Sequence, residues 1–248
     1  MVKRRHVVIT GGGRGIGAEI ARRFAALGDQ ITVLARTREE VESVADEVKG
    51  YGVRCDVGEP ASVEAAFFSA GPVDVLINNA GVARSSPVLK TDVRVWEEHL
   101  KVNLTGSFLC SLKVLPGMAS RGHGRIINIA SVAGLKGYPY LAAYCASKHG
   151  LIGLTRALAV EYADKGVTVN AICPGYVDGA LLSNSIQNIV DKTGRDAEEV
   201  RRELADRSPQ HRFVDAEEIA AMCIFLASEE ARSVNGQAIS VCGGELNV

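Results

Sequence analysis

A serine, a tyrosine and a lysine in the middle of the chain have types and spacing suited to proton transfer. Ser131 follows an apolar run at residues 125–130 that is typical of a buried strand, and Tyr144 and Lys148 come later, four residues apart. On a helix this spacing puts both side chains on one face, so a strand end and a helix start could direct all three toward one point. Tyr-x-x-x-Lys is also a common coincidence on amphipathic helices, so the pair gains meaning only from the rest of the chain.

Proton transfer to or from an oxygen is the chemistry that suits these side chains. A free phenol has a pKa of about 10, too high for acid–base work at neutral pH. A neighbouring ammonium favours the phenolate and lowers that pKa, and Lys148 is placed to supply the charge. Ser131 could hold the reacting oxygen through a hydrogen bond. We therefore expect Tyr144 to act as acid and base, assisted by Lys148 and Ser131.

A glycine-rich segment at residues 10–17, TGGGRGIG, lies between a β-branched run and a run with helical periodicity at 18–27. A strand, a glycine turn and a helix in this order form the context in which a glycine motif binds phosphate. Gly11 allows a tight turn, and Gly15 and Gly17 allow close approach of a pyrophosphate and of the helix to the strand, while the helix N-terminus offers free N–H groups. The spacing, G-x-x-x-G-x-G, differs from the G-x-G-x-x-G of the common dinucleotide fingerprint.

Strands and helices are predicted to alternate along the chain. Apolar runs predict seven strands, at residues 6–10, 31–34, 51–55, 73–77, 125–130, 167–173 and 237–241. Helical patterns predict helices at residues 18–27, 38–48, 60–68, 92–120, 143–163 and 219–226, the fourth broken near Pro116 and Gly117. Because the elements alternate, we expect one α/β domain over residues 1–248, with a parallel, doubly wound sheet and helices on both faces.

Residues 180–207 follow the sixth predicted strand and differ in character from the rest of the chain. They suggest two short helices separated by Gly194, and Asp196 with Glu199 is typical of the start of the second helix. Ligands of parallel sheets bind beyond the carboxyl ends of the strands, which is where this segment falls. We predict a two-helix lid over the substrate pocket, with a solvated helical insertion as the alternative.

Charge and composition exclude several classes of partner. A net charge of −1 gives no electrostatic reason to expect a nucleic acid or an anionic membrane as partner. No apolar segment is long enough to cross a bilayer. The six cysteines form no C-x-x-C pair and the five histidines lack metal-ligand spacing, so we expect buried free thiols and no metal site. Free thiols are typical of a reducing compartment, and the expected location is the cytoplasm.

Taken together, these motifs resemble the short-chain dehydrogenase/reductase (SDR) family over essentially the whole chain. The matching motifs fall in order: the glycine turn at 10–17, Asp56-Val57, residues 78–81, Asn103, Ser131, Tyr144-x-x-x-Lys148 and Pro174-Gly175. The resemblance implies a Rossmann-type fold and hydride transfer between a nicotinamide cofactor and a carbonyl or secondary alcohol. It also implies a homotetramer formed through the helices that contain Asn103 and Tyr144.

The resemblance further implies a role for each site residue. Asn103, Ser131, Tyr144 and Lys148 correspond to a catalytic tetrad: Tyr144 exchanges the substrate proton and Ser131 orients the carbonyl or hydroxyl. Lys148 lowers the phenol pKa and binds the nicotinamide ribose, and Asn103 helps to hold a water in a proton relay. Together with the residues argued above, the positions expected to contact the cofactor are Gly11, Gly13, Arg14, Gly15, Ile16, Gly17, Arg36, Asp56, Val57, Asn79, Ala80, Gly81, Tyr144, Lys148, Pro174, Gly175 and Val177.

One position departs from the family pattern. The family often has Thr after Pro-Gly-x-Val-x, where its hydroxyl binds the nicotinamide carboxamide, but this chain has Gly179 there. A backbone group or a later hydroxyl such as that of Ser183 would have to replace it.

The end of the second predicted strand indicates which cofactor is preferred. Enzymes selective for NAD usually place a carboxylate there, about 20 residues past the glycine motif, to bind the ribose 2′-hydroxyl. This chain has Ala35 and Arg36 instead, and Arg14 inside the glycine turn can supply a second positive charge. A 2′-phosphate would be attracted to this pair, so we predict NADP(H) over NAD(H). The alternative is that both arginines are merely solvated.

The C-terminal half is similar to bacterial 3-oxoacyl-thioester reductases and polyketide-type ketoreductases, for example at residues 212–214 and 241–244. We therefore predict an NADP(H)-dependent reductase of a ketone or 3-oxoacyl thioester. One alternative is a dehydrogenase that oxidises a secondary alcohol or 3-hydroxyacyl thioester. Another is a nucleotide-binding regulator without catalysis, which the complete tetrad disfavours because binding alone needs neither Ser131 nor Tyr144.

Overall fold

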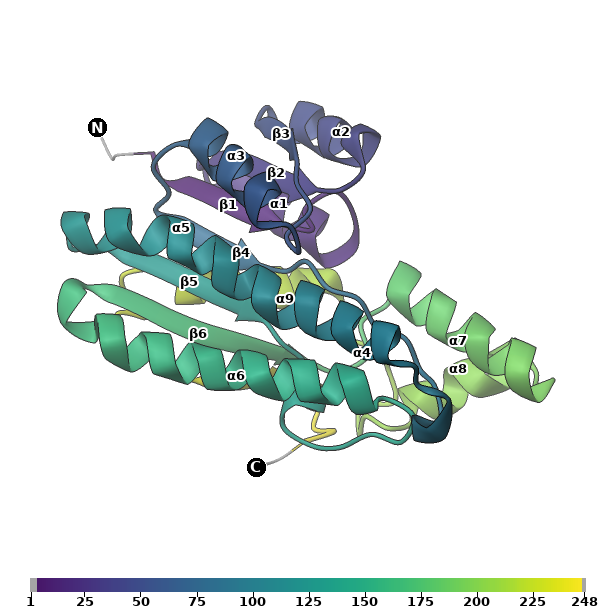
Figure 1. Cartoon of the computed structure of the whole chain (residues 1–248). Coiled ribbons are helices and arrows are strands. Elements are labelled where there is room, and N and C mark those ends of the chain that lie inside the picture. Colours follow the sequence, from purple (N-terminus) through teal and green to yellow (C-terminus); the bar gives the residue numbers. More distant parts are fainter. Residues whose placement is uncertain (1–3, 247–248) are drawn as a thin grey trace.

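Seven parallel strands form one sheet in the computed structural model, which describes residues 4–246 apart from the side chain of Leu181 (Figure 1). The sheet order is β3-β2-β1-β4-β5-β6-β7, so the strand order reverses between β1 and β4. The strands are β1 His6–Thr10, β2 Gln30–Ala35, β3 Tyr51–Arg54, β4 Val75–Asn78, β5 Gly124–Ile129, β6 Val167–Pro174 and β7 Ala238–Val241. This confirms the predicted doubly wound α/β fold, strand for strand.

Helices cover both faces of the sheet, which explains why the central strands are almost wholly apolar. Every residue of β1, β4, β5 and β6 is buried, as expected when both faces are covered. One face carries α1 Gly15–Ala26, α2 Arg38–Val48 and α9 Ala216–Leu226. The other carries α3 Pro60–Ala70, α5 Gly106–Arg121 and α6 Ala142–Tyr162.

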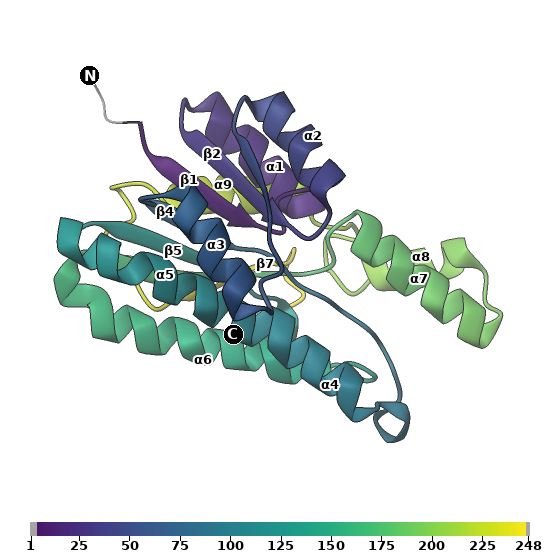
Figure 2. The same cartoon turned by 45° about the horizontal axis from the view of Figure 1, so that its top comes forward.

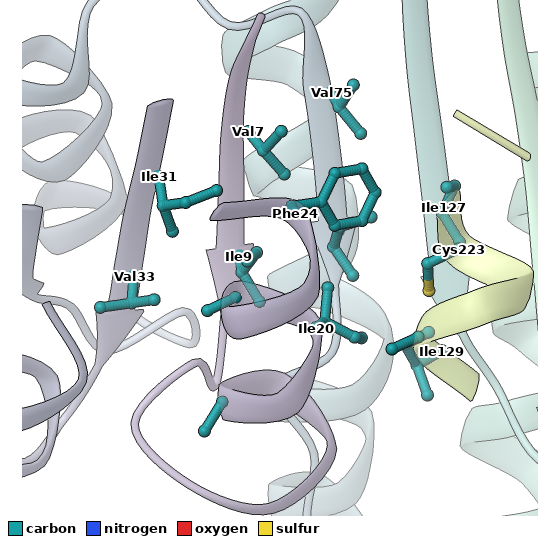
Figure 3. Close-up of a cluster of buried hydrophobic side chains, with 14 of the residues drawn as sticks. Val7, Ile9, Ile20, Phe24, Ile31, Val33, Val75, Ile127, Ile129 and Cys223 are labelled. Atoms are coloured by element: carbon teal, nitrogen blue, oxygen red, sulfur yellow. The ribbon is translucent and has the colours of Figure 1, made fainter. Parts of the chain in front are cut away.

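Each face of the sheet has its own hydrophobic core because successive strand residues point to opposite faces. Val7 and Ile9 of β1 pack with Ile20 and Phe24 of α1 in one core, where Cys223 of α9 also lies (Figure 3). Their neighbour in β1, Val8, packs in the other core, with residues of α3, α5 and α6. The two cores fix the strand ends, and therefore the residues that follow them.

The helix predicted at 92–120 proves to be three segments, and the predicted break near Pro116 is wrong. The segments are α4 Val93–His99, a π-helical segment Leu100–Thr105, and α5, which runs through Pro116 to Arg121. Pro116 is exposed while Val114 and Met118 are buried, so the helix keeps its packing. Because proline has no N–H, the carbonyl of Leu112 loses its partner within the helix. Leu112 is itself exposed to solvent. The irregularity lies instead around Asn103.

Helices α7 Ala180–Thr193 and α8 Ala197–Ala205 project together from the body of the molecule (Figure 2). They share a small core of their own, formed by Leu182, Ile186, Val200 and Leu204. Asp196 caps α8 by accepting from the backbone N–H groups of Glu198 and Glu199, each at 3.0 Å. The two-helix form predicted for 180–207 is therefore confirmed. None of the described helices is long and apolar enough to cross a membrane.

Candidate active site

A cavity of about 580 Å³ opens at the carboxyl edge of the sheet. Its walls come from the segments that follow β4, β5 and β6 and from both helices of the 180–207 segment. The predicted site residues on these walls are Ile16, Asn79, Gly81, Ser131, Tyr144, Lys148, Pro174, Gly175 and Val177. This is the edge at which ligands of doubly wound sheets bind.

Ser131, Tyr144 and Lys148 meet in this cavity, as their spacing predicts. Ser131 follows β5 and its Oγ accepts a hydrogen bond from the Ala133 N–H at 3.1 Å. The Ser131 hydroxyl also hydrogen-bonds the phenol of Tyr144, which lies in the first turn of α6. Lys148, one turn further along α6, is 4% exposed; its Nζ donates to the Ile129 carbonyl at 2.7 Å and lies 5.7 Å from the centre of the Tyr144 ring.

Burial shifts the pKa values of both Tyr144 and Lys148. It raises the pKa of the Tyr144 phenol to about 12, against the opposing effect of the Ser131 hydrogen bond. It lowers the pKa of the Lys148 ammonium to about 8. In the protein alone, desolvation therefore outweighs any help from the lysine, contrary to the lowered phenol pKa predicted from the spacing. The physical reason is that Lys148 Nζ is bonded to a backbone carbonyl and the phenol lies in a poorly solvated place.

Asn103 lies behind the cavity wall. Its side chain is fully buried in the π-helical segment, and its Nδ2 donates to the Val82 carbonyl and to Ser147 Oγ, each at 2.9 Å. Its Oδ1 accepts from the Val82 N–H at 2.8 Å. Ser147 Oγ in turn donates to the Tyr144 carbonyl at 2.8 Å. The Asn103 amide therefore connects the loop after β4 to the helix that carries Tyr144.

The glycine turn is held against the end of β4 by Asn79 and Thr10. Asn79 Nδ2 donates to the carbonyls of Thr10 and Gly11, each at 3.0 Å. Thr10 Oγ1 accepts from the backbone N–H groups of Asn79 and Ala80, at 3.0 and 3.1 Å. Gly11 has a positive φ of 62°, and a Cβ there would lie 2.9 Å from the Ala80 Cα. Only glycine fits this position.

The start of α1 fits a pyrophosphate. Gly15, its first residue, has φ of 54° and nothing lies within 4 Å of the place a Cβ would occupy. A Cβ on Gly17, by contrast, would lie 2.3 Å from the Gly11 carbonyl oxygen. Arg14 makes no side-chain capping bond, and the first turn of the helix has no acidic residue. The first N–H groups of α1 therefore face an open, uncapped space suited to an anion.

Several residues predicted to contact the cofactor lie outside the cavity wall. Arg36 follows β2 with an exposed side chain, as predicted. Arg14 is also exposed, but its Nη1 lies 3.3 Å from a carboxylate oxygen of Glu40, so an incoming phosphate would have to share it. Asp56 and Val57 follow β3, and Asp56 Oδ1 accepts from the Gly58 N–H at 2.9 Å. Gly13, which is packed against Glu40, and Ala80 are also outside the cavity wall.

The segment after β6 brings Gly175 and Val177 to the cavity but offers no substitute hydroxyl from Ser183. Gly179 precedes α7 with φ of 148°. Ser183 donates its hydroxyl to the Gly179 carbonyl at 3.2 Å within its own helix, and it is not on the cavity wall. The carboxamide anchor that Gly179 removes is therefore not replaced by Ser183 in this arrangement.

Sequence reasoning missed two residues that contact the tetrad. Ser147 is buried between Asn103 and the Tyr144 backbone, and its position three residues after Tyr144 was a usable signal. His99 packs edge-on against the Tyr144 ring, with ring centres 6.3 Å apart, and its Nε2 accepts from the Arg84 N–H at 3.1 Å. No local pattern marks His99. Within residues 4–246, no three His, Cys, Asp or Glu side chains gather as a metal site would require.

Comparison with known proteins agrees with this geometry. The family model for short chain dehydrogenases matches residues 5–190, so the chain belongs to the short chain dehydrogenase family. It is similar to the granaticin polyketide synthase putative ketoacyl reductase 1 of Streptomyces violaceoruber, at 38% identity over 96% of this chain and 91% of that protein. It is also similar to the D-beta-hydroxybutyrate dehydrogenase of Rhizobium meliloti, at 37% identity over 96% of each chain.

Solved structures agree with the sequence relatives. A variant of actinorhodin polyketide ketoreductase, crystallised with NADPH, superimposes with a TM-score of 0.93 at 38% identity, covering 99% of this chain and 98% of that one. Levodione reductase gives a TM-score of 0.92 at 33% identity, covering 97% of each chain. The Rossmann-type fold predicted from the resemblance is confirmed.

Proposed function

We propose that the protein is an NADP(H)-dependent oxidoreductase that reduces a ketone or a 3-oxoacyl thioester to the alcohol. The observation that carries this proposal is the meeting of Ser131, Tyr144 and Lys148 in a cavity beside the open start of α1. The cavity accepts a carbonyl compound and the α1 start accepts a pyrophosphate, so hydride donor and acceptor share one site. Similarity to polyketide ketoacyl reductases and to the 3-oxoacyl-[acyl-carrier-protein] reductase FabG of Aquifex aeolicus supports this substrate class.

The side chains divide the work of carbonyl reduction. The bound nicotinamide supplies the hydride that adds to the carbonyl carbon. Ser131 orients the carbonyl oxygen by hydrogen bonding, and Tyr144 donates its phenolic proton to the oxygen as negative charge develops there. Lys148 binds the nicotinamide ribose and carries the charge that eases loss of the phenolic proton. Asn103, behind the cavity wall, helps to position that wall for a proton relay.

The charge state of Tyr144 supports the reductive direction. A phenol with a pKa of about 12 is protonated at neutral pH and ready to donate. The oxidative alternative needs the phenolate. Similarity to a D-beta-hydroxybutyrate dehydrogenase is the observation that supports this alternative. A regulator without catalysis needs no hydrogen-bonded serine and tyrosine in its cavity, so this alternative is disfavoured.

The preference for NADP(H) rests on Arg36, whose guanidinium is exposed beside the end of β2, with Arg14 close to the same turn. The uncapped start of α1 would receive the pyrophosphate, and the residues after β3, β4 and β6 would hold the rest of the cofactor. The NADPH-bound ketoreductase neighbour supports this assignment.

The remaining parts of the proposal concern the lid, the assembly and the compartment. Helix α7 lines the cavity through Leu182 and Asn188, and α8 lines it through Val200 and Leu204, which supports a lid at 180–207. Exposed Trp96 and Phe108 on α4 and α5, beside Asn103, and exposed Val160 on α6, the helix of Tyr144, support a homotetramer through these helices. Light scattering of the pure protein measures this state. The six cysteines are all buried and unpaired, which supports the cytoplasm.

Purified protein mixed with NADPH and a panel of ketones and 3-oxoacyl thioesters tests the proposal directly. Loss of NADPH absorbance that depends on the carbonyl compound is expected. A protein that binds NADPH but oxidises it with none of the panel would be the non-catalytic alternative.

A further inference from the structure

One arginine on the cavity wall, Arg207, has no carboxylate partner among the described residues. Arg207 follows α8 at the end of the lid and lies where the lid meets the body. Its guanidinium carbon is 5.8 Å from the ring centres of both Tyr138 and Tyr176, which also line the cavity. Tyr138 comes from the loop before α6 and Tyr176 from the segment after β6, so three separate parts of the chain meet at this guanidinium.

The acidic groups near Arg207 already have other partners. Glu203 lies 2.7 Å from an Arg195 nitrogen. Glu245 lies 3.4 Å from Lys136 Nζ and also accepts the hydrogen bond of the Tyr138 hydroxyl. The positive charge of Arg207 is therefore not neutralised by either of them.

The other titratable groups around Arg207 are also occupied. Asp206 lies 2.9 Å from His211 Nδ1, and Lys192, the remaining lid cation on the wall, donates to the Ser85 carbonyl at 3.2 Å. Of the two arginines that line the cavity in the described part of the chain, Arg195 is paired with Glu199 and Glu203, which leaves the guanidinium of Arg207 available to a ligand.

A cation–π contact with aromatic rings leaves the hydrogen-bonding groups of an arginine free. The guanidinium carbon lies within cation–π range of both rings, an attraction that uses none of the five N–H donors of arginine. These donors match a carboxylate or a phosphate, which they can bind through two parallel hydrogen bonds. The two tyrosines therefore orient Arg207 without using its hydrogen-bonding capacity.

We propose that Arg207 binds an anionic group, a carboxylate or a phosphate, on the substrate whose carbonyl is placed at Tyr144. Tyr176 links the two parts of the cavity that such a substrate would occupy. Its phenol interacts electrostatically with the phenol of Tyr144, and its ring lies near the guanidinium of Arg207. The inference rests on the proposed reductase function, since it concerns the substrate of the same cavity.

Two matched pairs of substrates test this inference. Acetoacetate is compared with its methyl ester, and acetoacetyl coenzyme A with the acetoacetyl thioester of N-acetylcysteamine, so that each pair differs in the anion. We expect Arg207→Gln to lower the ratio of kcat/KM for the anionic to the neutral member by about 10- to 100-fold in one pair. A fall in the acetoacetate pair identifies a carboxylate as the ligand, and a fall in the thioester pair identifies a phosphate.

Arg202→Gln is the matched control, because Arg202 is an exposed arginine of α8 that is not on the cavity wall. It should keep the wild-type ratios. Unchanged ratios for both pairs in Arg207→Gln would overturn the inference and leave Arg207 as a packing residue.

A binding measurement separates failure of this inference from failure of the proposed function. Calorimetric titration of the same compounds into the complex of enzyme and NADP+ needs no turnover. At least tenfold weaker binding of an anionic compound to Arg207→Gln than to the wild type is expected even for a compound that is not reduced. Equal affinity in both proteins would overturn the inference, whereas absence of turnover with all four compounds in the wild type would contradict only the reductase function.

Discussion

Tyr144 and Lys148 lie side by side in a poorly solvated place, and burial favours the uncharged form of each. The phenol has a raised pKa and the ammonium a lowered one, for the same physical reason. Reduction uses the phenol, which is the stable form, and oxidation uses the phenolate, which is not. The protein without ligands therefore already holds Tyr144 in the protonation state that reduction needs, and not in the state that oxidation needs.

Tyr144→Phe should lower kcat for ketone reduction by about 10²- to 10⁴-fold, because the proton donor is lost while the ring and its packing remain. The Kd for NADPH, measured by fluorescence titration, should change little. Tyr162→Phe, at the other end of α6, is the control for removing a hydroxyl from the same helix. Near-normal turnover of Tyr144→Phe would refute the assignment of the proton donor.

The pH dependence should differ between the two directions of the reaction. Because the Tyr144 phenol has a pKa raised to about 12, its protonated form persists throughout the neutral range, and reduction should not decline through its loss. Oxidation of the product alcohol needs the phenolate, whose population grows as the pH rises toward that pKa, so its kcat/KM should increase with pH. Rate profiles in both directions check this, and an oxidative rate that is flat from neutral pH upward would contradict it.

Arg36 should determine the choice of cofactor. Charge-assisted contacts to a 2′-phosphate at an exposed site are worth about 1.5–3 kcal/mol, or a ten- to hundredfold preference for NADPH in kcat/KM. Arg36→Ala should reduce this preference, and added salt should weaken NADPH binding more than NADH binding. Arg38→Ala, an exposed arginine at the start of α2, is the control. Equal or better kinetics with NADH in the wild type would show that the interpretation of Arg36 is wrong.

At the scale of elements, the buried strands were predicted correctly from the sequence, whereas the break in the fourth predicted helix was misplaced. The central strands were predictable because a strand buried on both faces is a continuous apolar run. Pro116 was misleading because a proline on the exposed side of a helix removes a hydrogen bond without ending the helix. No local sequence pattern predicts the π-helical segment around Asn103. The side chain of Asn103 in this segment bonds to Val82 and Ser147, which are far away in sequence.

The proposed lid at 180–207 should exchange its backbone amides rapidly in the free enzyme and slowly with cofactor and substrate bound. Its hydrogen bonds to the body are few and partly exposed, such as those from Asn188 to Ser85 and from Arg201 to Asp178. Hydrogen exchange measured by mass spectrometry checks this, with β5 as an internal reference that should be protected in both states. Equal protection of 180–207 in both states would show a fixed helical insertion.

At the scale of the whole molecule, the site is assembled from strand ends that are far apart in sequence. Ser131, Tyr144 and Lys148 were predictable as a group because one strand and one helix position all three. The proximity of Arg207 to Tyr138 and Tyr176 was not, because it depends on how the 180–207 segment packs against the body. Motifs within one strand–turn–helix unit are thus visible in the sequence, whereas contacts between units depend on tertiary packing.

The clamp formed by Thr10 and Asn79 links cofactor binding to folding. The glycine turn has its shape only when β1 and β4 are paired, because its carbonyls are held by an amide on the other strand. The unfolded chain therefore has no cofactor site, and the cofactor should add to the free energy of unfolding by mass action. At a concentration of 100 times Kd the gain is about 2.7 kcal/mol, so Tm should rise steadily with added NADPH. Thr10→Val should reduce this rise although Thr10 is itself buried, because it removes the hydroxyl that holds the end of β4 against the glycine turn. An undiminished rise would show that the turn keeps its shape without the clamp.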